Sequence, residues 1–232
     1  MSHRPSISTR NNKYKITDKF IKYGERVVWQ IISRETGVRG GWIEKEDNLS
    51  FEGDCWIADS AVVCDDAKIS GNAQVHGEAI INGKAKVSEN ATVSGQARIT
   101  ESASIADHAF VSDKSTISGS AKLFENAVVS GNSGIFGLAK VHGNAEVRHS
   151  LIAGSSDVCG SAKIQLGQVY DDATVSGGWV FGRVYGHGKV SGGCVCTNAS
   201  ITGDAEIKSG KAREGEYSKG VLRLPDGEEE EQ

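Results

Sequence analysis

The sequence has few aromatic residues and almost no proline. Aromatic residues make up 6% of the 232 residues, and the two prolines, Pro5 and Pro225, lie near the ends. A wide globular core is hard to fill with so few large side chains, whereas a narrow core of valine, isoleucine and alanine needs none. Because proline cannot donate a backbone hydrogen bond, its absence between the ends allows a continuous sheet there.

Long apolar runs and paired cysteine motifs are also missing. No apolar run approaches the ~18 residues of a membrane-spanning helix, and no charged start followed by an apolar segment suggests a secretory signal. The cysteines are odd in number and lack the CxxC spacing of a zinc site, which predicts no metal site and reduced thiols in a cytoplasmic protein. They are Cys55, Cys64, Cys159, Cys194 and Cys196.

The excess of acidic over basic charge comes from the C-terminus. The formal net charge is −4, and Asp226 with Glu228 to Glu231 contributes five acids, so residues 1–225 sum to about +1. This balance gives no electrostatic argument for a nucleic-acid partner.

An apolar residue recurs every six positions from Phe51 to Val147. Four positions after each except the last comes a small residue, usually alanine, and two positions after nearly all of them comes Gly, Asp or Glu. The small and the aliphatic residue are two apart, so both point to one face of a short strand, and the next residues form a turn with positive φ. The series is Phe51, Ile57, Val63, Ile69, Val75, Ile81, Val87, Val93, Ile99, Ile105, Val111, Ile117, Leu123, Val129, Ile135, Val141 and Val147.

A second period, of three hexads, predicts the cross-section. One row of aliphatic residues at this spacing is mostly valine, from Ile57 through Val75 to Val147, and another is mostly isoleucine, from Val63 through Ile81 to Ile135. Like residues that stack along each of three sides produce such rows, so three hexads form one coil. We therefore predict an all-β protein, a triangular parallel β-helix of about nine coils at the spacing of neighbouring strands, with Ile81, Ile99 and Ile117 stacked.

The hexad resembles that of the trimeric, LpxA-like left-handed β-helix superfamily, whose members include acyltransferases. The variant with Gly two residues after the aliphatic is most similar to YdcK-like acyltransferase proteins and related bacterial and prophage proteins. Gly40-Gly41-Trp42-Ile43-Glu44, followed by Asn48-Leu49-Ser50, resembles the motif that leads into the first coil there. The resemblance covers roughly residues 25–209 and implies left-handed winding and a homotrimer.

The ends and the interruptions of the repeat predict the organisation of the chain. Residues 1–13 are polar and expected to be disordered, and residues 14–50 form a small N-terminal cap whose core includes Trp29 and Trp42. The β-helix follows over residues 51–209, with regular hexads at 51–147, irregular coils at 148–195 and regular hexads again at 196–209. Residues 210–232 leave the pattern and end in an acidic, solvated tail.

Two kinds of outward residue recur along the coils. Lys68, Lys86, Ser104, Lys122 and Lys140 fall in one row, where like charges are either well solvated or meet an anion. Apolar outward residues suggest a covered surface, for which the resemblance implies the neighbouring subunit of a trimer; a ligand, another partner or no role at all are the alternatives. The predicted oligomer contacts are Trp56, Phe110, Phe124, Val128, Phe136 and Leu138.

The segment from Trp179 to Lys189 departs most from the hexad. Its residues alternate strictly, with valine and glycine inward, so we expect one irregular strand with a binding surface on its outer face. The alternative is an internal seam, covered by residues 211–225 with Val221, Leu222 and Leu224 as a plug, or by another subunit. The predicted binding residues are Trp179, Phe181, Arg183, Tyr185 and His187.

Two functions remain open. The first is a binding or scaffold module without a cofactor that presents a rigid surface to an unidentified protein partner, in keeping with the prophage resemblance. The second, implied by the resemblance, is an acyltransferase that uses acetyl-CoA and a histidine base, with His149 or His187 as the candidate. The other histidines of the repeat region, His76, His108 and His142, are weaker candidates. Acyltransferases of this architecture build the donor site on a loop, and residues 51–147 contain no insertion.

Overall fold

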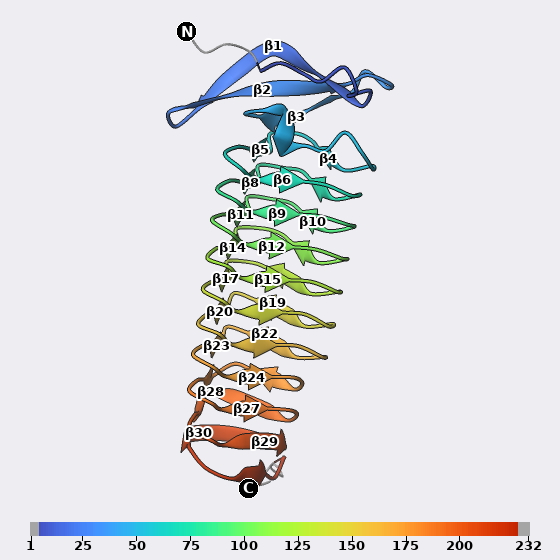
Figure 1. Ribbon diagram of the computed structural model, residues 1–232. Helices are drawn as coiled ribbons and strands as arrows, with labels where there is room; N and C mark the ends of the chain where they lie inside the picture. Colours follow the sequence, from blue (N-terminus) through green and yellow to red (C-terminus); the bar gives the residue numbers. More distant parts are fainter. Residues whose placement is uncertain (1–4, 227–232) are drawn as a thin grey trace, which may run out of the picture. The chain divides into compact units, whose positions relative to one another are not determined.

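The computed structural model describes residues 5–226, so most of the predicted acidic tail lies outside the described residues. The chain divides into two compact units, Met1–Gly119 and Ser120–Gln232. The described part of the first unit contains one short 3-10 helix, η1, and fourteen strands (Figure 1). Its elements are β1 Tyr14–Tyr23, β2 Arg26–Ser33, β3 Arg39–Ile43, η1 Glu46–Asn48, β4 Trp56–Ile57, β5 Val62–Val63, β6 Lys68–Ile69, β7 Gln74–Val75, β8 Ile80–Ile81, β9 Lys86–Val87, β10 Thr92–Val93, β11 Arg98–Ile99, β12 Ser104–Ile105, β13 Phe110–Val111 and β14 Thr116–Ile117.

Each hexad of the first unit forms one short strand, and strands three hexads apart pair in parallel. Val75 pairs with Val93 and Val93 with Val111. Ile81 pairs with Ile99, and Ile99 with Ile117, which confirms the predicted stack. The aliphatic and alanine side chains of these hexads are fully or almost fully buried, so the core is a narrow column of small apolar groups.

The turns between hexads have positive φ, at glycine and at acidic residues alike. A Cβ on Gly71 would lie 2.7 Å from the backbone nitrogen of Glu89 in the next coil, so glycine is needed there for space as well as for conformation. At other turns a carboxylate reaches the following coil instead: the backbone N–H of Gly77 donates to Asp59, and that of Gly83 to Asp65. These bonds compensate for the strain of an acidic residue at positive φ.

The N-terminal cap begins as an antiparallel sheet and becomes part of the solenoid. β1 pairs with β2, and β2 with β3, both antiparallel. β3 then pairs in parallel with β5, so Ile43 stacks on Val63 and the solenoid starts inside the predicted cap. Trp29 is buried, Trp42 is half-buried, and the hydroxyl of the buried Tyr14 lies 2.9 Å from the carbonyl oxygen of Leu49.

Residues just before β1 also contact the cap. The backbone N–H of Ser8 donates to the Glu46 carboxylate at 2.9 Å, and the side chain of the buried Asn11 donates to the same carboxylate. The Lys13 ammonium donates to the carbonyl oxygens of Ser50 and Gly53. In the described part of the segment that was expected to be disordered, these bonds hold the chain against the cap.

The second unit contains strands β15 to β31, and its later coils contain fewer residues than three hexads. Val129 pairs with Val147, which lies three full hexads later in the sequence. Val175 pairs with Val190, which lies less than three hexads later. The strands are β15 Lys122–Leu123, β16 Val128–Ser130, β17 Gly134–Ile135, β18 Lys140–Val141, β19 Glu146–Arg148, β20 Leu151–Ile152, β21 Asp157–Val158, β22 Lys163–Gln165, β23 Gln168–Val169, β24 Thr174–Val175, β25 Trp179–Val180, β26 Arg183–Val184, β27 Lys189–Val190, β28 Cys194–Ile201, β29 Glu206–Ser209, β30 Lys211–Tyr217 and β31 Val221–Arg223.

The C-terminal segment continues the solenoid, which corrects two expectations. β30 pairs in parallel with β28, and β31 with β29, so residues 211–223 extend the sheets and do not fold back as a plug. The solenoid has about 11 turns rather than nine, because it includes β3, β30 and β31 and because its later coils are short. The handedness of the winding stays a prediction from the resemblance.

Candidate functional site

The alternation predicted a single strand from Trp179 to Lys189, and this prediction is wrong. The structure divides these residues among β25, β26 and β27. Trp179 and Val180 form β25, which pairs with β22, whereas Arg183 and Val184 form β26, which pairs with β23. The chain turns a corner at Gly182, so the outward side chains lie on different sides of the coil. The inward positions of Val180, Gly182 and Val184 are buried as predicted.

Lys163, Trp179 and Phe181 form the first group of outward side chains, here termed the Trp179 cluster. The rings of Trp179 and Phe181 lie parallel with their centroids 5.8 Å apart, and the Lys163 ammonium lies 5.1 Å from the centroid of the indole. Trp179 is 43% exposed although it has both neighbours. A large aromatic side chain in this position keeps apolar area in water, where a partner can cover it.

A small hollow of about 120 Å³ lies beside the indole and is lined by Glu146, Arg148, Lys163, Gln165 and Trp179, with Ile164 at its base. Glu146 forms ion pairs with Arg148 at 3.6 Å and with Lys163 at 3.5 Å. Two cations around one carboxylate leave a net positive charge around the hollow.

Tyr170, Arg183 and Tyr185 form a second group, the tyrosine cluster. The two phenol rings are parallel, with centroids 5.1 Å apart. Burial and the neighbouring Tyr185 raise the pKa of Tyr170, and Arg183 opposes this shift. Tyr170 comes from the preceding coil and was not among the predicted residues, because its neighbour in space lies a full coil further along the sequence.

The two histidines proposed as catalytic bases have different surroundings. His149 lies in a turn with positive φ, and its Nδ1 accepts a hydrogen bond from the backbone N–H of Asn132 at 3.3 Å. This hydrogen bond uses the lone pair of Nδ1. His187 is well exposed, and its Nδ1 lies 3.9 Å from a carboxylate oxygen of Asp172.

The predicted oligomer contacts are exposed to different degrees. Phe110 in β13 and Leu138 in a turn are 37% and 60% exposed, and the others are half-buried. Phe124 stacks on His142, and Phe136 covers the backbone of Gly134, so both side chains have contacts within the chain.

The first three members of the lysine row line an open groove of about 440 Å³ in the first unit. Lys68 pairs in register with Lys86, which pairs with Ser104, and all three side chains line the groove together with Glu46 and Asp47 from η1. Phe51 also lines it and is 37% exposed, so this first member of the hexad series is not inward; Leu49 is buried in its place and bridges to Ile69.

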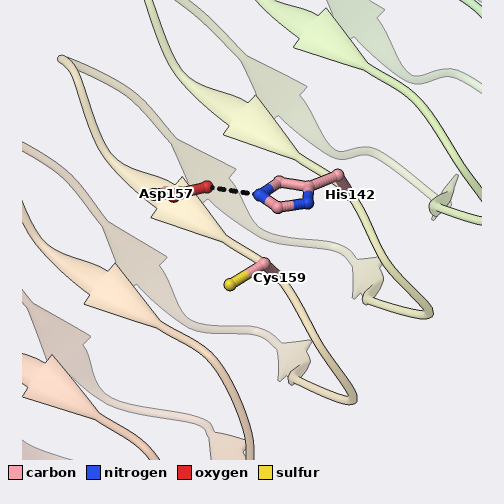
Figure 2. Close-up of side chains that lie close together, drawn as sticks. All are labelled: His142, Asp157 and Cys159. Carbon is pink, nitrogen blue, oxygen red and sulfur yellow. Dashed lines mark hydrogen bonds and ion pairs between the residues drawn. The ribbon is translucent and has the colours of Figure 1, made fainter.

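A third group, His142, Asp157 and Cys159, was not predicted as a site. Asp157 and Cys159 flank the inward Val158, so both point outward from β21, and His142 projects toward them from the preceding coil (Figure 2). The His142 Nε2 lies 3.0 Å from Asp157 Oδ1. The pKa of the Cys159 thiol is raised, first by burial and then by the carboxylates of Asp157 and Glu125.

Counting residues through the first slip of the repeat could have located this group. The spacing from Val147 to Val158 falls one residue short of two hexads. The deletion shifts the register, so Val141 pairs with Val158 and the next residue, His142, comes to lie beside Cys159.

The fold is a parallel β-solenoid of short repeats, and the side-chain groups described above lie on the outside of its coils. The family model YdcK Beta solenoid repeat matches residues 168–183, which include β23 to β26. The match covers this short stretch of the chain, and the parallel β-solenoid fold agrees with a repeat of that type. No curated protein matches the chain. Within residues 5–226, none of the helical structure is long and apolar enough to cross a membrane.

Proposed function

We propose that this protein is a binding module that presents the Trp179 cluster to a protein partner. The observation that carries the proposal is the exposed indole of Trp179, which stacks on Phe181 and makes a cation–π contact with Lys163. It lies beside a hollow with a net positive charge. Tryptophan supplies much of the binding energy at protein interfaces, and the charges favour an acidic segment with one apolar anchor.

The size of the hollow also favours a protein partner. Sites for cofactors and drug-sized ligands occupy about 300–1,000 Å³, whereas this hollow measures about 120 Å³, which suits one side chain. The acyltransferase alternative has less support, because the Nδ1 of His149 already accepts a hydrogen bond and His187 lies in an exposed turn.

The test uses a photoreactive residue placed at Phe181 in the full chain, expressed in the source cells. We expect one defined protein to be crosslinked, and Trp179→Ala to reduce that product at least tenfold, because it removes the anchor of the surface. The matched control is the same photoreactive residue at Leu138, an exposed turn position in the same unit, which should not yield this product.

Two results would contradict the binding function. One is equal crosslinking from positions 138 and 181, or a product that Trp179→Ala leaves unchanged. The other is turnover of acetyl-CoA with an amine or sugar acceptor that is lost in His187→Ala, because this would make the protein an enzyme.

We further propose that the module is a homotrimer, as the resemblance implies. The expected mass by light scattering at micromolar concentration is three times that of the 24.6 kDa chain. Phe110→Lys should lower this mass if the exposed ring lies between subunits, because a buried unpaired charge opposes association. Gln168→Lys, at an exposed position outside the predicted contacts, is the control. A stable monomer of the unmodified chain would rule out the trimer.

A further inference from the structure

The side chains of His142, Asp157 and Cys159 converge at one point on the outside of the second unit. Each offers one donor atom, and the three donor atoms lie within 4.8 Å of one another. Figure 2 shows the imidazole directed at the Asp157 carboxylate, with the Cys159 sulfur below them. Imidazole, carboxylate and thiolate together are a donor set suited to zinc and related divalent metals.

The imidazole is held in place from two directions. The Phe124 ring stacks on it, with centroids 4.5 Å apart and planes 8° from parallel. The Glu125 carboxylate lies 3.7 Å from His142 Nδ1, the nitrogen that faces away from Asp157, and is itself fixed by the backbone N–H of Gly143 at 2.7 Å. Metal-binding histidines usually direct the second ring nitrogen at a carboxylate, which leaves the first one free for the metal.

A second group of possible metal ligands in the described chain, Glu44, Cys64 and Asp65, is a poorer candidate. The Arg26 guanidinium already pairs with Asp65, so a cation occupies that side of the group. Glu44 accepts a hydrogen bond from the Asp65 backbone, and Cys64 is fully buried. The three residues of the His142 group are partly exposed.

We propose that His142 Nε2, Asp157 and Cys159 bind one divalent metal ion of the zinc type, with Glu125 as a positioning residue for the imidazole. Three protein ligands leave one position of a tetrahedral site open to water or to a ligand. The absence of a CxxC pair is no argument against this site, because its ligands come from two coils. The metal site does not depend on the binding function of the Trp179 cluster.

Cobalt(II) titration of the reduced, metal-free full chain tests the proposal. We expect one ion per chain, a thiolate-to-cobalt charge-transfer band, tetrahedral visible bands and displacement of cobalt by Zn²⁺. Binding should weaken as the pH falls, because protons compete with the metal for the imidazole and the thiolate. Cys159→Ser should abolish the charge-transfer band, and Glu125→Gln should weaken cobalt binding about tenfold.

Cys194 and Cys196 provide the control, because their sulfur atoms lie 4.0 Å apart in the same unit and could bind cobalt themselves. The double variant Cys194→Ser, Cys196→Ser should keep the band and the stoichiometry. Loss of the band in this variant, its persistence in Cys159→Ser, or no cobalt-dependent spectrum in the unmodified chain would overturn the proposal. In that case the His142–Asp157 contact is an ordinary surface hydrogen bond.

Discussion

Asn48→Ala is expected to lower the free energy of unfolding by about 3–4 kcal/mol, because one buried amide satisfies four backbone groups. The Asn48 Oδ1 accepts hydrogen bonds from the backbone N–H groups of Glu44 and Lys45, at 3.1 and 2.9 Å. Its Nδ2 donates to the carbonyl oxygens of Asp65 and Ala67, at 3.0 and 2.9 Å. Alanine removes this partner from all four where the cap joins the first coils, although the Glu44 N–H keeps its bond to the Val63 carbonyl oxygen.

Urea denaturation followed by circular dichroism measures the loss, and hydrogen exchange locates it in the N-terminal cap. Asn72→Ala is the matched control, because Asn72 is exposed and its amide accepts one bond from the backbone N–H of Asp54 at 3.3 Å and donates one to Asn90 at 3.1 Å. The control should cost less than about 1 kcal/mol. Equal losses of unfolding free energy in the two variants would show that the Asn48 amide does not stabilise the connection between the cap and the solenoid.

Gly182→Ala is expected to destabilise the protein by about 3 kcal/mol, at the upper end of the usual cost of overpacking. Gly182 lies at the corner between β25 and β26, and a Cβ there would come within 2.3 Å of the carbonyl oxygens of both Cys196 and Ala199. Both atoms belong to the backbone of the next coil, so they cannot move aside without disturbing the pairing with β28.

Gly134→Ala separates this clash from the general effect of adding a methyl group. A Cβ at Gly134 meets only the Phe136 ring, whose half-buried side chain can rotate away, so the expected cost is below about 1 kcal/mol. The comparison uses urea denaturation with tryptophan fluorescence. A Gly182→Ala variant as stable as Gly134→Ala would contradict the close approach of the next coil's backbone to Gly182.

The candidate site shows how far a repeat can be read from a sequence. The outward placement of Trp179 and Arg183 followed from their alternation with inward valine and glycine. Their separation onto two sides did not follow, because a corner with an inward glycine keeps the same alternation as a straight strand. Residues that meet across coils, such as Tyr170 with Tyr185 and His142 with Cys159, depend on the number of residues in each coil.

The sequence by itself determined the repeat, the narrow aliphatic core and the stack of Ile81, Ile99 and Ile117, because a strict period of three hexads permits one register only. Positive φ at the acidic turns also followed from their position in the hexad. The tertiary structure alone decided where the solenoid begins and ends, since β3, β30 and β31 lie outside the regular hexads and join by backbone pairing. The length of the shortened coil places His142 beside Cys159, but only the tertiary structure shows how near the donor atoms of His142, Asp157 and Cys159 come to one another, because that depends on the side-chain conformations.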